Sequence, residues 1–110
     1  MKNFNNSPLI EKEIQRLVLD YLTIKKFFHW RNNSGAMVSE YKGKKRFFRF
    51  GETGSPDIFA LIKGTLYGIE IKSIKGKQNE NQQEYEQRFK KAGGTYILAY
   101  SLEDVINKLK

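Results

Sequence analysis

Three charged residues interrupt two apolar segments in the middle of this chain. Asp57 precedes the apolar run "IFALI", and Glu70 and Lys72 lie within the following run, "TLYGIEIKSI". Carboxylate oxygens are the ligands that Mg²⁺ and Mn²⁺ prefer, and a lysine beside them can offset residual negative charge or contact an anionic substrate. The three charges therefore either converge on a site or lie on the solvated face of a half-exposed sheet.

The expected strand pairing decides whether these charges meet. Side chains two apart along a strand share a face, so Glu70 and Lys72 point the same way. If "KG" at 63–64 is a two-residue hairpin turn, Ile62 pairs with Thr65. Counting back along both strands then places Asp57 opposite Glu70, at a Cβ separation of about 4.5–5.5 Å. A one-residue slip in register would separate them.

Two facing carboxylates repel each other, so one of them must take up a proton or both must share a cation. A divalent metal removes the repulsion. The alternative is a cross-strand salt bridge on a solvated face, and the spacing alone leaves both readings open.

The composition limits the classes of protein to consider. The 110 residues predict one domain over 1–110, and 39% hydrophobic residues predict a folded one. No apolar run has the length of a membrane span, and the N-terminus lacks the apolar core of a secretory signal. The chain has no cysteine and one histidine, which favours a cytoplasmic protein and a metal site made of oxygen ligands.

The charge balance favours a polyanionic partner. The formal net charge is +8, with a pI of about 9.7. The segment "KGKKRFFRF" at 42–50 interleaves five basic residues with aromatic ones, a mixture that suits phosphates and exposed bases. The alternative is that the charge only maintains solubility.

The elements that position these residues follow from the hydrophobic periodicity. Residues 9–28 predict an amphipathic helix capped at Ser7-Pro8, "HWRNNSGA" predicts a turn, and 36–50 predict a hairpin closed near "YKGKK". "GETGSP" predicts a loop between this hairpin and the strand "DIFALI".

After the second apolar run, Asn79 and Gln82 have the spacing of a capping box, and Gly93-Gly94 predicts the end of that helix. The strand "TYILAYS" and the terminal helix "LEDVINKLK" follow. The sequence predicts a small α/β fold in which a mixed sheet is flanked by helices, in the order α-βββ(β)-α-β-α.

The motif resembles a known nuclease signature. "GSPD" followed by "EIK" is similar to the PD-(D/E)xK pattern, with Asp57, Glu70 and Lys72 in its three positions. Over roughly residues 10–105, segments such as "HWRNNSGA", "RFGETGSPDIFAL" and "GIEIKSIKGKQNENQQEYEQRFKKAGGTYILAY" resemble, in order, the VRR-NUC (virus-type replication-repair nuclease) family. The resemblance implies a PD-(D/E)xK nuclease-like core of the stand-alone phage or bacterial type.

The family likeness also implies roles for individual residues. Asp57, Glu70 and the backbone carbonyl of Ile71 would hold Mg²⁺ or Mn²⁺, and Lys72 would orient the attacking water and stabilise charge on the phosphate. Glu11 matches the family's glutamate in the first helix, which implies a catalytic role as a further metal ligand; the alternative is an acid that complements the helix dipole. Gln82 matches a glutamine of the second helix, and capping alone would also explain it.

The implied partner is DNA. Arg31, Asn32 and Asn33 match a segment that borders the substrate groove, although a turn held by asparagine side chains explains them equally well. His29 is expected to be structural. The expected DNA-binding residues are Arg31, Asn32, Lys42, Lys44, Lys45, Arg46, Arg49, Lys75 and Lys77.

The resemblance favours a metal-dependent endonuclease that acts as a homodimer on branched DNA such as four-way (Holliday) junctions. Two other readings stay open. One is a catalytically inert DNA-binding module on a nuclease core, and the other is an RNA or restriction-type endonuclease.

Overall fold

A computed structural model describes residues 9–32, 35–50 and 52–109. The chain forms three helices and six strands in these ranges, in an order that places five strands between the first two helices. The elements are α1 (Glu11–Ile24), β1 (Phe28–Arg31), β2 (Gly35–Tyr41), β3 (Lys44–Phe50), β4 (Ile58–Ile62), β5 (Thr65–Ile71), α2 (Glu80–Lys91), β6 (Thr95–Ala99) and α3 (Leu102–Lys108). None of the described helices is long and apolar enough to cross a membrane.

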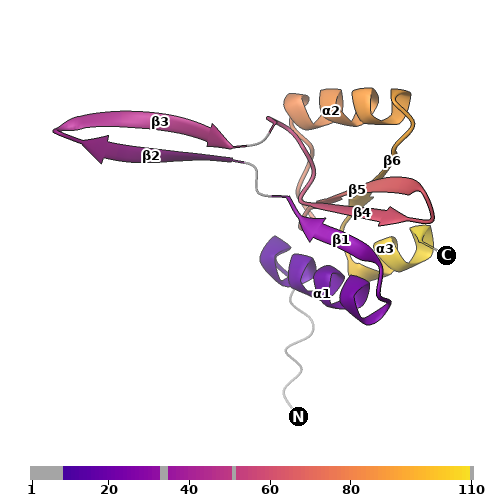
Figure 1. Ribbon diagram of the computed structural model, residues 1–110. Helices are drawn as coiled ribbons and strands as arrows, with labels where there is room; N and C mark the ends of the chain where they lie inside the picture. The colour runs from indigo at the N-terminus through magenta and orange to yellow at the C-terminus, as the bar shows by residue number, and fades with distance from the viewer. Residues whose placement is uncertain (1–8, 33–34, 51, 110) are drawn as a thin grey trace, which may run out of the picture.

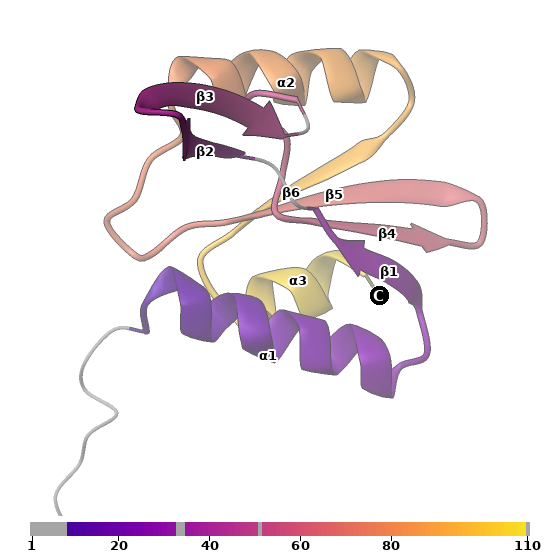
Figure 2. The same ribbon diagram turned by 60° about the vertical axis from the view of Figure 1, so that its left-hand side comes forward.

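The centre of the molecule is a mixed four-stranded sheet in the order β1-β4-β5-β6. β1 and β4 pair antiparallel, as do β4 and β5, whereas β6 runs parallel to β5 after the crossover through α2. Helices α1 and α3 lie on one face of the sheet and α2 on the other (Figure 1, Figure 2). Both faces of the sheet are thus covered by helices, but α1 has buried residues and α2 has none.

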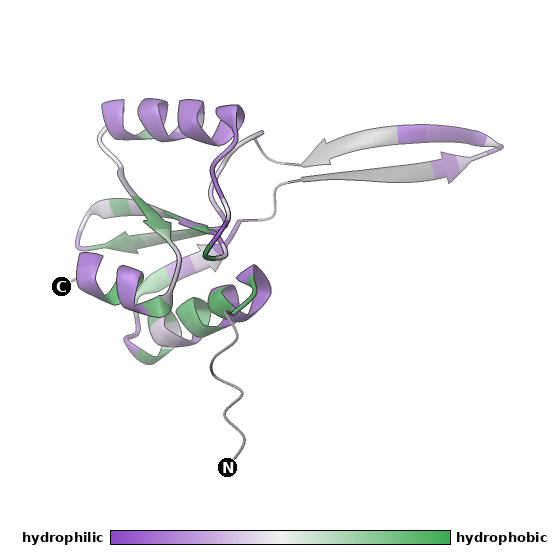
Figure 3. Ribbon diagram, turned by 180° about the vertical axis from the view of Figure 1, so that it is seen from behind, coloured by the Kyte–Doolittle hydropathy of each residue, from purple (hydrophilic) through white to green (hydrophobic). Residues whose placement is uncertain are grey.

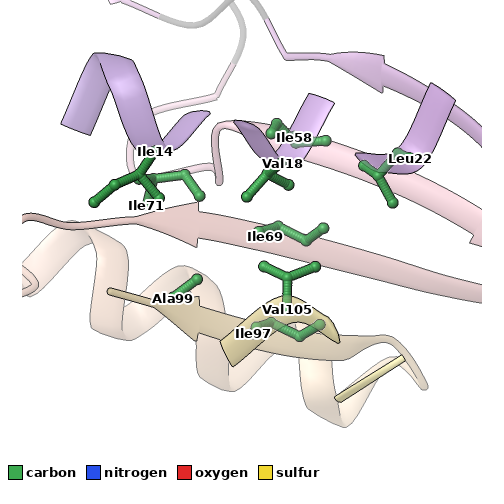
Figure 4. Packing of buried hydrophobic residues seen from close by; sticks show 9 residues of the cluster. All are labelled: Ile14, Val18, Leu22, Ile58, Ile69, Ile71, Ile97, Ala99 and Val105. Atoms are coloured by element: carbon green, nitrogen blue, oxygen red, sulfur yellow. The ribbon is translucent and has the colours of Figure 1, made fainter. Parts of the chain in front are cut away.

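The hydrophobic core lies between the sheet and the α1 face. Alternate residues of β4 and β5 point into it, and one stripe of α1 packs on them (Figure 4). The buried members are Ile14, Val18, Leu22, Ile58, Ile69, Ile71, Ile97, Ala99 and Val105. Glu70 lies between Ile69 and Ile71 in sequence, so the strand alternation turns it to the opposite face, toward α2.

Helix α2 covers that opposite face only in part. The helix has no fully buried residue, and Figure 3 shows it as hydrophilic along almost its whole length. Phe89 provides its main apolar contact: a Cβ added at Gly68 would meet the Phe89 ring at 3.3 Å and one at Gly94 at 2.3 Å. Glycine at these positions lets the helix sit close to β5 and β6, which brings its first turn over Glu70.

The sequence prediction of the fold is confirmed for most elements. The hairpin, the strands around 58–71 with their Lys63-Gly64 turn, and both later helices form as predicted. Lys63 and Gly64 both have positive φ, 49° and 85°, as a tight hairpin turn requires.

Two predictions around α1 are wrong. The helix ends at Ile24 and does not reach 28, because Lys26 adopts a left-handed conformation with φ of 61° and turns the chain out of the helix. The segment predicted as a turn, 29–36, contains most of β1 and the start of β2; β1 forms through pairing with β4, which gives five strands before α2. The N-cap is Ile10; Ser7-Pro8 lies outside the described residues.

The β2–β3 hairpin forms a separate two-stranded sheet. Its strands pair from Gly35↔Phe50 to Tyr41↔Lys44, and Lys42-Gly43 makes the turn. Figure 1 shows the hairpin extending away from the four-stranded sheet, and Figures 1 and 2 agree that it leaves on the α2 side. We call this hairpin, residues 35–50, the basic arm.

Candidate active site

The strand register brings Asp57 and Glu70 together as the spacing predicts. Ile58 pairs with Ile69 and Ile62 with Thr65, so the next step along the hairpin sets Asp57 opposite Glu70. One carboxylate oxygen of Asp57 accepts a hydrogen bond from the backbone N–H of Ile71 at 2.8 Å. This contact fixes the carboxylate across the end of β5, beside the glutamate.

Glu70 is buried, with 3% of its surface exposed. Its Oε2 accepts a hydrogen bond from Gln82 Nε2 at 2.8 Å and lies 3.7 Å from the ammonium of Lys72. Its Oε1 is buried and has no hydrogen-bond partner among the described residues. The alternative of a salt bridge on a solvated face is therefore wrong, because the Lys72 and Glu70 side chains that form the ion pair are only 14% and 4% exposed.

The electrostatics of the pair follow from burial and from like charge. Burial, and then the negative charge of Asp57, raise the pKa of Glu70 to about 8 against the opposing effect of Lys72. Burial also raises the pKa of Asp57, while the hydrogen bond from Ile71 opposes that rise. At neutral pH the pair therefore binds a proton unless another positive charge takes its place.

This donor set fits a divalent cation. Two adjacent carboxylates supply the hard oxygen ligands, and the unpartnered Oε1 of Glu70 is a buried acceptor that still needs a positive group. Within the described ranges, no three acidic or histidine side chains lie close enough to form a complete metal cluster. The centre is thus a carboxylate pair, to which waters, a backbone carbonyl or substrate oxygens would have to add further ligands.

The Gln82 side chain both caps α2 and contacts Glu70, so capping is not its only interaction. Its Oε1 accepts from the backbone N–H of Asn79 at 2.9 Å, and Asn79 Oδ1 accepts from the backbone N–H of Gln82 at 2.8 Å. This capping box orients the side chain so that its amide nitrogen points at Glu70. The start of α2 is consequently tied to the carboxylate pair.

Glu11 approaches the pair from the opposite layer. Its Oε2 accepts weakly from the backbone N–H of Ser73, at 3.4 Å, just beyond the end of β5. Its negative charge contributes to the raised pKa values of Asp57 and Glu70. Glu13, in contrast, accepts from the backbone N–H of Ile10 and caps α1. Of the two glutamates, Glu11 is the one that faces the site.

Asn32 positions the loop before Asp57. Its side-chain amide donates to Ser55 Oγ at 2.7 Å and to the carbonyl of Pro56 at 2.8 Å, and its backbone N–H donates to the carbonyl of Asp57 at 2.7 Å. Ser55 and Pro56 are buried. These contacts favour the structural alternative for Asn32, in which the asparagine holds a turn. Asn33 lies outside the described residues.

A sequence search for charged residues misses these hydrogen bonds of Asn32, and it also misses a second packing contact of the same loop. At Gly54, with φ of 85°, an added Cβ would lie 2.3 Å from the backbone oxygen of Asn81. The loop that leads into Asp57 is thereby pressed against the start of α2. The signal in the sequence is a short one, the asparagine of "WRN" together with the glycine and proline of "GSPD".

The expected DNA-binding residues fall into two groups. Arg31 is exposed, and its charge slightly opposes the rise in the pKa of Asp57, so it lies near the site. Lys75 lines, with Glu11 and Ser73, a hollow of about 650 Å³ beside the end of β5, and Lys77 is exposed in the following loop. The others lie on the basic arm: Lys42, Lys44, Lys45 and Arg46 are exposed near its tip, and the Arg49 side chain lies outside the description.

His29 makes only local contacts. Its Nδ1 lies 2.8 Å from the carbonyl of Phe27 and its Nε2 3.4 Å from Thr23 Oγ1. Both nitrogens are thus engaged where the chain passes from α1 into β1. This geometry favours the structural role expected for His29.

Comparison with known proteins finds similarity among solved structures. No family model matches the chain, and no curated protein matches it either. A solved structure described as a VRR_NUC domain superposes on 90% of this chain and 92% of its own length, with a TM-score of 0.63 and 18% sequence identity. The chain has the VRR-NUC fold.

In this VRR-NUC fold the site residues come from four different elements. Asp57 precedes β4, Glu70 lies on β5 with Lys72 directly after it, Gln82 belongs to the first turn of α2, and Glu11 starts α1. The shared fold agrees with the resemblance that the motif suggested. At 18% identity the match establishes the architecture, and the roles of the residues rest on their contacts.

Proposed function

We propose that this protein is a divalent-metal-dependent endonuclease that hydrolyses phosphodiester bonds in DNA. The observation that carries the proposal is the buried Glu70, which faces Asp57, contacts Lys72 and Gln82, and retains one oxygen without a partner among the residues that the structure describes. A carboxylate pair with one buried and one half-buried member is costly in a purely structural setting, because burial disfavours the charged form of both groups.

Asp57 and Glu70 would hold Mg²⁺ or Mn²⁺, with the backbone carbonyl of Ile71 as a further ligand. When bound, such a cation lowers the pKa of water and stabilises negative charge on a phosphate undergoing attack. The N–H of Ile71 already orients Asp57, and the same residue's position beside both carboxylates supports its carbonyl as a ligand.

The remaining residues act on the substrate and on the ligands. Lys72, whose side chain is mostly covered, presents its ammonium beside Glu70, where it can orient a water and hydrogen-bond a phosphate oxygen. Gln82 fixes the rotamer of Glu70 through its amide donor. Glu11, at the start of α1, adds a third negative charge near the carboxylate pair, which strengthens the preference of the site for a cation.

The basic arm would hold the DNA backbone. Its exposed tip carries Lys42, Lys44, Lys45 and Arg46, and the arm leaves the body on the α2 side, the side that Glu70 faces. Because phosphate contacts release counterions, binding through the arm should be strongly salt-dependent and indifferent to base sequence.

The finer proposal is that two chains form a symmetric dimer that resolves branched DNA such as four-way junctions. Each chain contributes one carboxylate pair, whereas resolution of a junction needs two symmetric cuts. A two-fold dimer supplies two such sites at a fixed separation.

The function is tested by incubating the protein with labelled linear, flapped, single-stranded and four-way DNAs in Mg²⁺ or Mn²⁺ and mapping the product ends. Wild-type protein should cut with either metal and not in EDTA. Asp57→Ala and Lys72→Ala should abolish cutting but keep DNA binding. Equal cutting of linear duplex and junction would refute the junction preference, and a mass near 12.9 kDa in light scattering, with and without DNA, would refute the dimer.

The alternatives predict different outcomes of the same assay. An inert DNA-binding module would bind every DNA and cut none under any metal condition. An RNA endonuclease would cut a matched RNA panel in preference to the DNA one. The pairing of the half-buried Asp57 with the buried Glu70 favours an active enzyme over the inert module, since a DNA-binding surface has no need of it.

A further inference from the structure

An exposed apolar surface lies on the α2 side of the sheet, beyond the reach of α2. β1 is an edge strand, and its Phe28 and Trp30 side chains are 68% and 43% exposed. Leu61 of β4, opposite Phe28, is 42% exposed, and the half-buried Phe59 lies opposite Trp30. We call these four residues the aromatic edge. A contiguous exposed apolar patch of this kind marks a binding surface.

The rings of the aromatic edge form a continuous row that ends under α2. Ring centroids are 5.9 Å apart between Phe28 and Trp30, 5.4 Å between Trp30 and Phe59, and 6.0 Å between Phe59 and Phe89 of α2. Phe89 anchors the inner end, whereas Trp30 and Phe28 at the outer end still expose ring surface. These contacts hold Trp30 in place, so its ring is a preformed surface for a flat ligand.

The pairing of β1 with β4 fixes the position of this surface relative to the carboxylates. Trp30 pairs with Phe59, and two residues further on the backbone N–H of Asn32 bonds the carbonyl of Asp57. Two residues span about 7 Å along a strand and keep the side chain on the same face. That distance corresponds to about two nucleotides at the ~3.4 Å rise of a stacked strand.

The two chain segments that form the aromatic edge carry only basic charges. The segment 21–32 contains Lys25, Lys26 and Arg31 and no acidic residue, and the segment 58–69 contains Lys63 and none. All four of these basic side chains are exposed. In a two-fold contact through this edge, a second copy would set positive charge against positive charge, whereas a polyanion with flat, apolar faces matches both the rings and their rim.

We propose that the aromatic edge binds unpaired nucleotides of the DNA substrate, with a base stacked on Trp30 and Phe28 and the strand leading from there to the carboxylate pair. The proposal deepens the nuclease function proposed above and rests on it. Stacking on an aromatic ring tolerates every base, but it requires a base outside its own duplex. The edge would therefore select single-stranded regions next to the cut, which flapped and splayed DNA contains and blunt duplex lacks; a fully paired four-way junction would have to open base pairs at its branch point to reach the rings.

Trp30 is the sole tryptophan of the chain, so its fluorescence reports directly on this surface. Wild-type protein in EDTA is titrated with oligothymidylate and with a blunt duplex of equal length, at low salt. We expect saturable quenching of Trp30 by the single strand and much weaker quenching by the duplex. Because EDTA removes divalent cations, the measurement does not depend on cleavage.

Matched variants test the ring itself, with affinity measured by the anisotropy of a labelled oligonucleotide. Trp30→Ala and Trp30→Leu should weaken single-strand binding about 5- to 100-fold, since each stacked base contributes strongly, and change duplex binding little. Trp30→Phe should retain most of the affinity. Phe28→Ala keeps the Trp30 reporter and should lower both the affinity and the extent of quenching. Far-UV circular dichroism checks that each variant is folded.

Several results would overturn the proposal: equal quenching by single strand and duplex, binding without quenching, or no DNA binding. Fluorescence that changes with protein concentration in the absence of DNA, and stops doing so in Phe28→Glu, would assign the edge to a second copy of the chain instead. Metal-dependent cutting is scored separately. Cutting without quenching contradicts only the base-stacking surface, whereas quenching without cutting in Mg²⁺ or Mn²⁺ contradicts only the nuclease.

Discussion

Replacing Glu70 by glutamine should make the metal-free protein more stable at alkaline pH. Burial and the charge of Asp57 raise the pKa of Glu70 from its ordinary 4.5 to about 8, so the folded state binds a proton that the unfolded state has lost. Stability that depends on this proton is fully present below pH 4.5 and is lost as the pH rises through 8. Glutamine carries no charge at any pH and avoids the loss.

The raised pKa sets the upper limit of the effect. A shift from 4.5 to about 8, at ~1.4 kcal/mol for each pH unit, gives up to about 5 kcal/mol of unfolding free energy lost by the wild type. Lys72 remains beside position 70 in both proteins, so the comparison isolates the carboxylate. We expect the Glu70→Gln variant to gain a few kcal/mol over the wild type above pH 8, and little below pH 5.

Urea unfolding in EDTA at pH 5, 7 and 9, followed by circular dichroism, measures this difference. Glu84→Gln is the matched control, because Glu84 is an exposed glutamate in the middle of α2. Its pH profile should run parallel to that of the wild type. The reasoning is refuted if the pH profile of the unfolding free energy of Glu70→Gln is also parallel to that of the wild type. Glu70 would then titrate near its ordinary pKa, and its burial would not raise that pKa.

Three further perturbations separate positioning, support and DNA binding. Asn32→Ala removes both side-chain hydrogen bonds to the loop before the first carboxylate and should slow cutting roughly 10- to 100-fold, with duplex binding in a gel-shift assay unchanged; an unaltered rate would reject this role of the hydrogen bonds. Gln82→Ala should cost about 1–2 kcal/mol in urea unfolding, because α2 loses its capping box, and should also slow cutting; loss of stability alone would make the residue purely structural. The triple variant Lys44→Ala, Lys45→Ala, Arg46→Ala should weaken binding to all sequences alike, with the slope of log affinity against log salt falling by about 0.9 for each lost contact on duplex DNA. Binding that is as tight and as salt-dependent as in the wild type would exclude the arm as the DNA contact.

The site could be predicted to the extent that it depends on local register. A two-residue turn at Lys63-Gly64 forces one pairing, and that pairing alone places Asp57 opposite Glu70. One of the two contacts of Gln82 could be predicted, because the spacing of Asn79 and Gln82 indicates a capping box. Its hydrogen bond to Glu70 could not, because that contact depends on how α2 packs on the sheet.

The rest depended on long-range contacts that leave little periodic pattern. β1 is mostly exposed and only four residues long, so the apolar–polar alternation of "FHWR" is too short to predict a strand, and its pairing with β4 makes it one. The hydrogen bonds of Asn32 to the Ser55-Pro56 loop join residues more than twenty positions apart, and the short motifs "WRN" and "GSPD" do not by themselves indicate that these residues meet. α1 ends at Ile24, and the left-handed Lys26 then turns the chain away; in the sequence, Phe27 and Phe28 extend the apolar period past that end.

The most direct test of the central claim is a calorimetric titration of Mn²⁺ into the wild-type protein near pH 7, repeated in buffers of different ionisation enthalpy. If Asp57 and Glu70 form the cation site, Mn²⁺ binds saturably and displaces the proton that the raised pKa of Glu70 retains, so the apparent enthalpy varies with the buffer. Glu70→Gln should lose both the binding and the proton release. Absence of Mn²⁺ binding by the wild type, or unchanged binding by Glu70→Gln, would contradict the account.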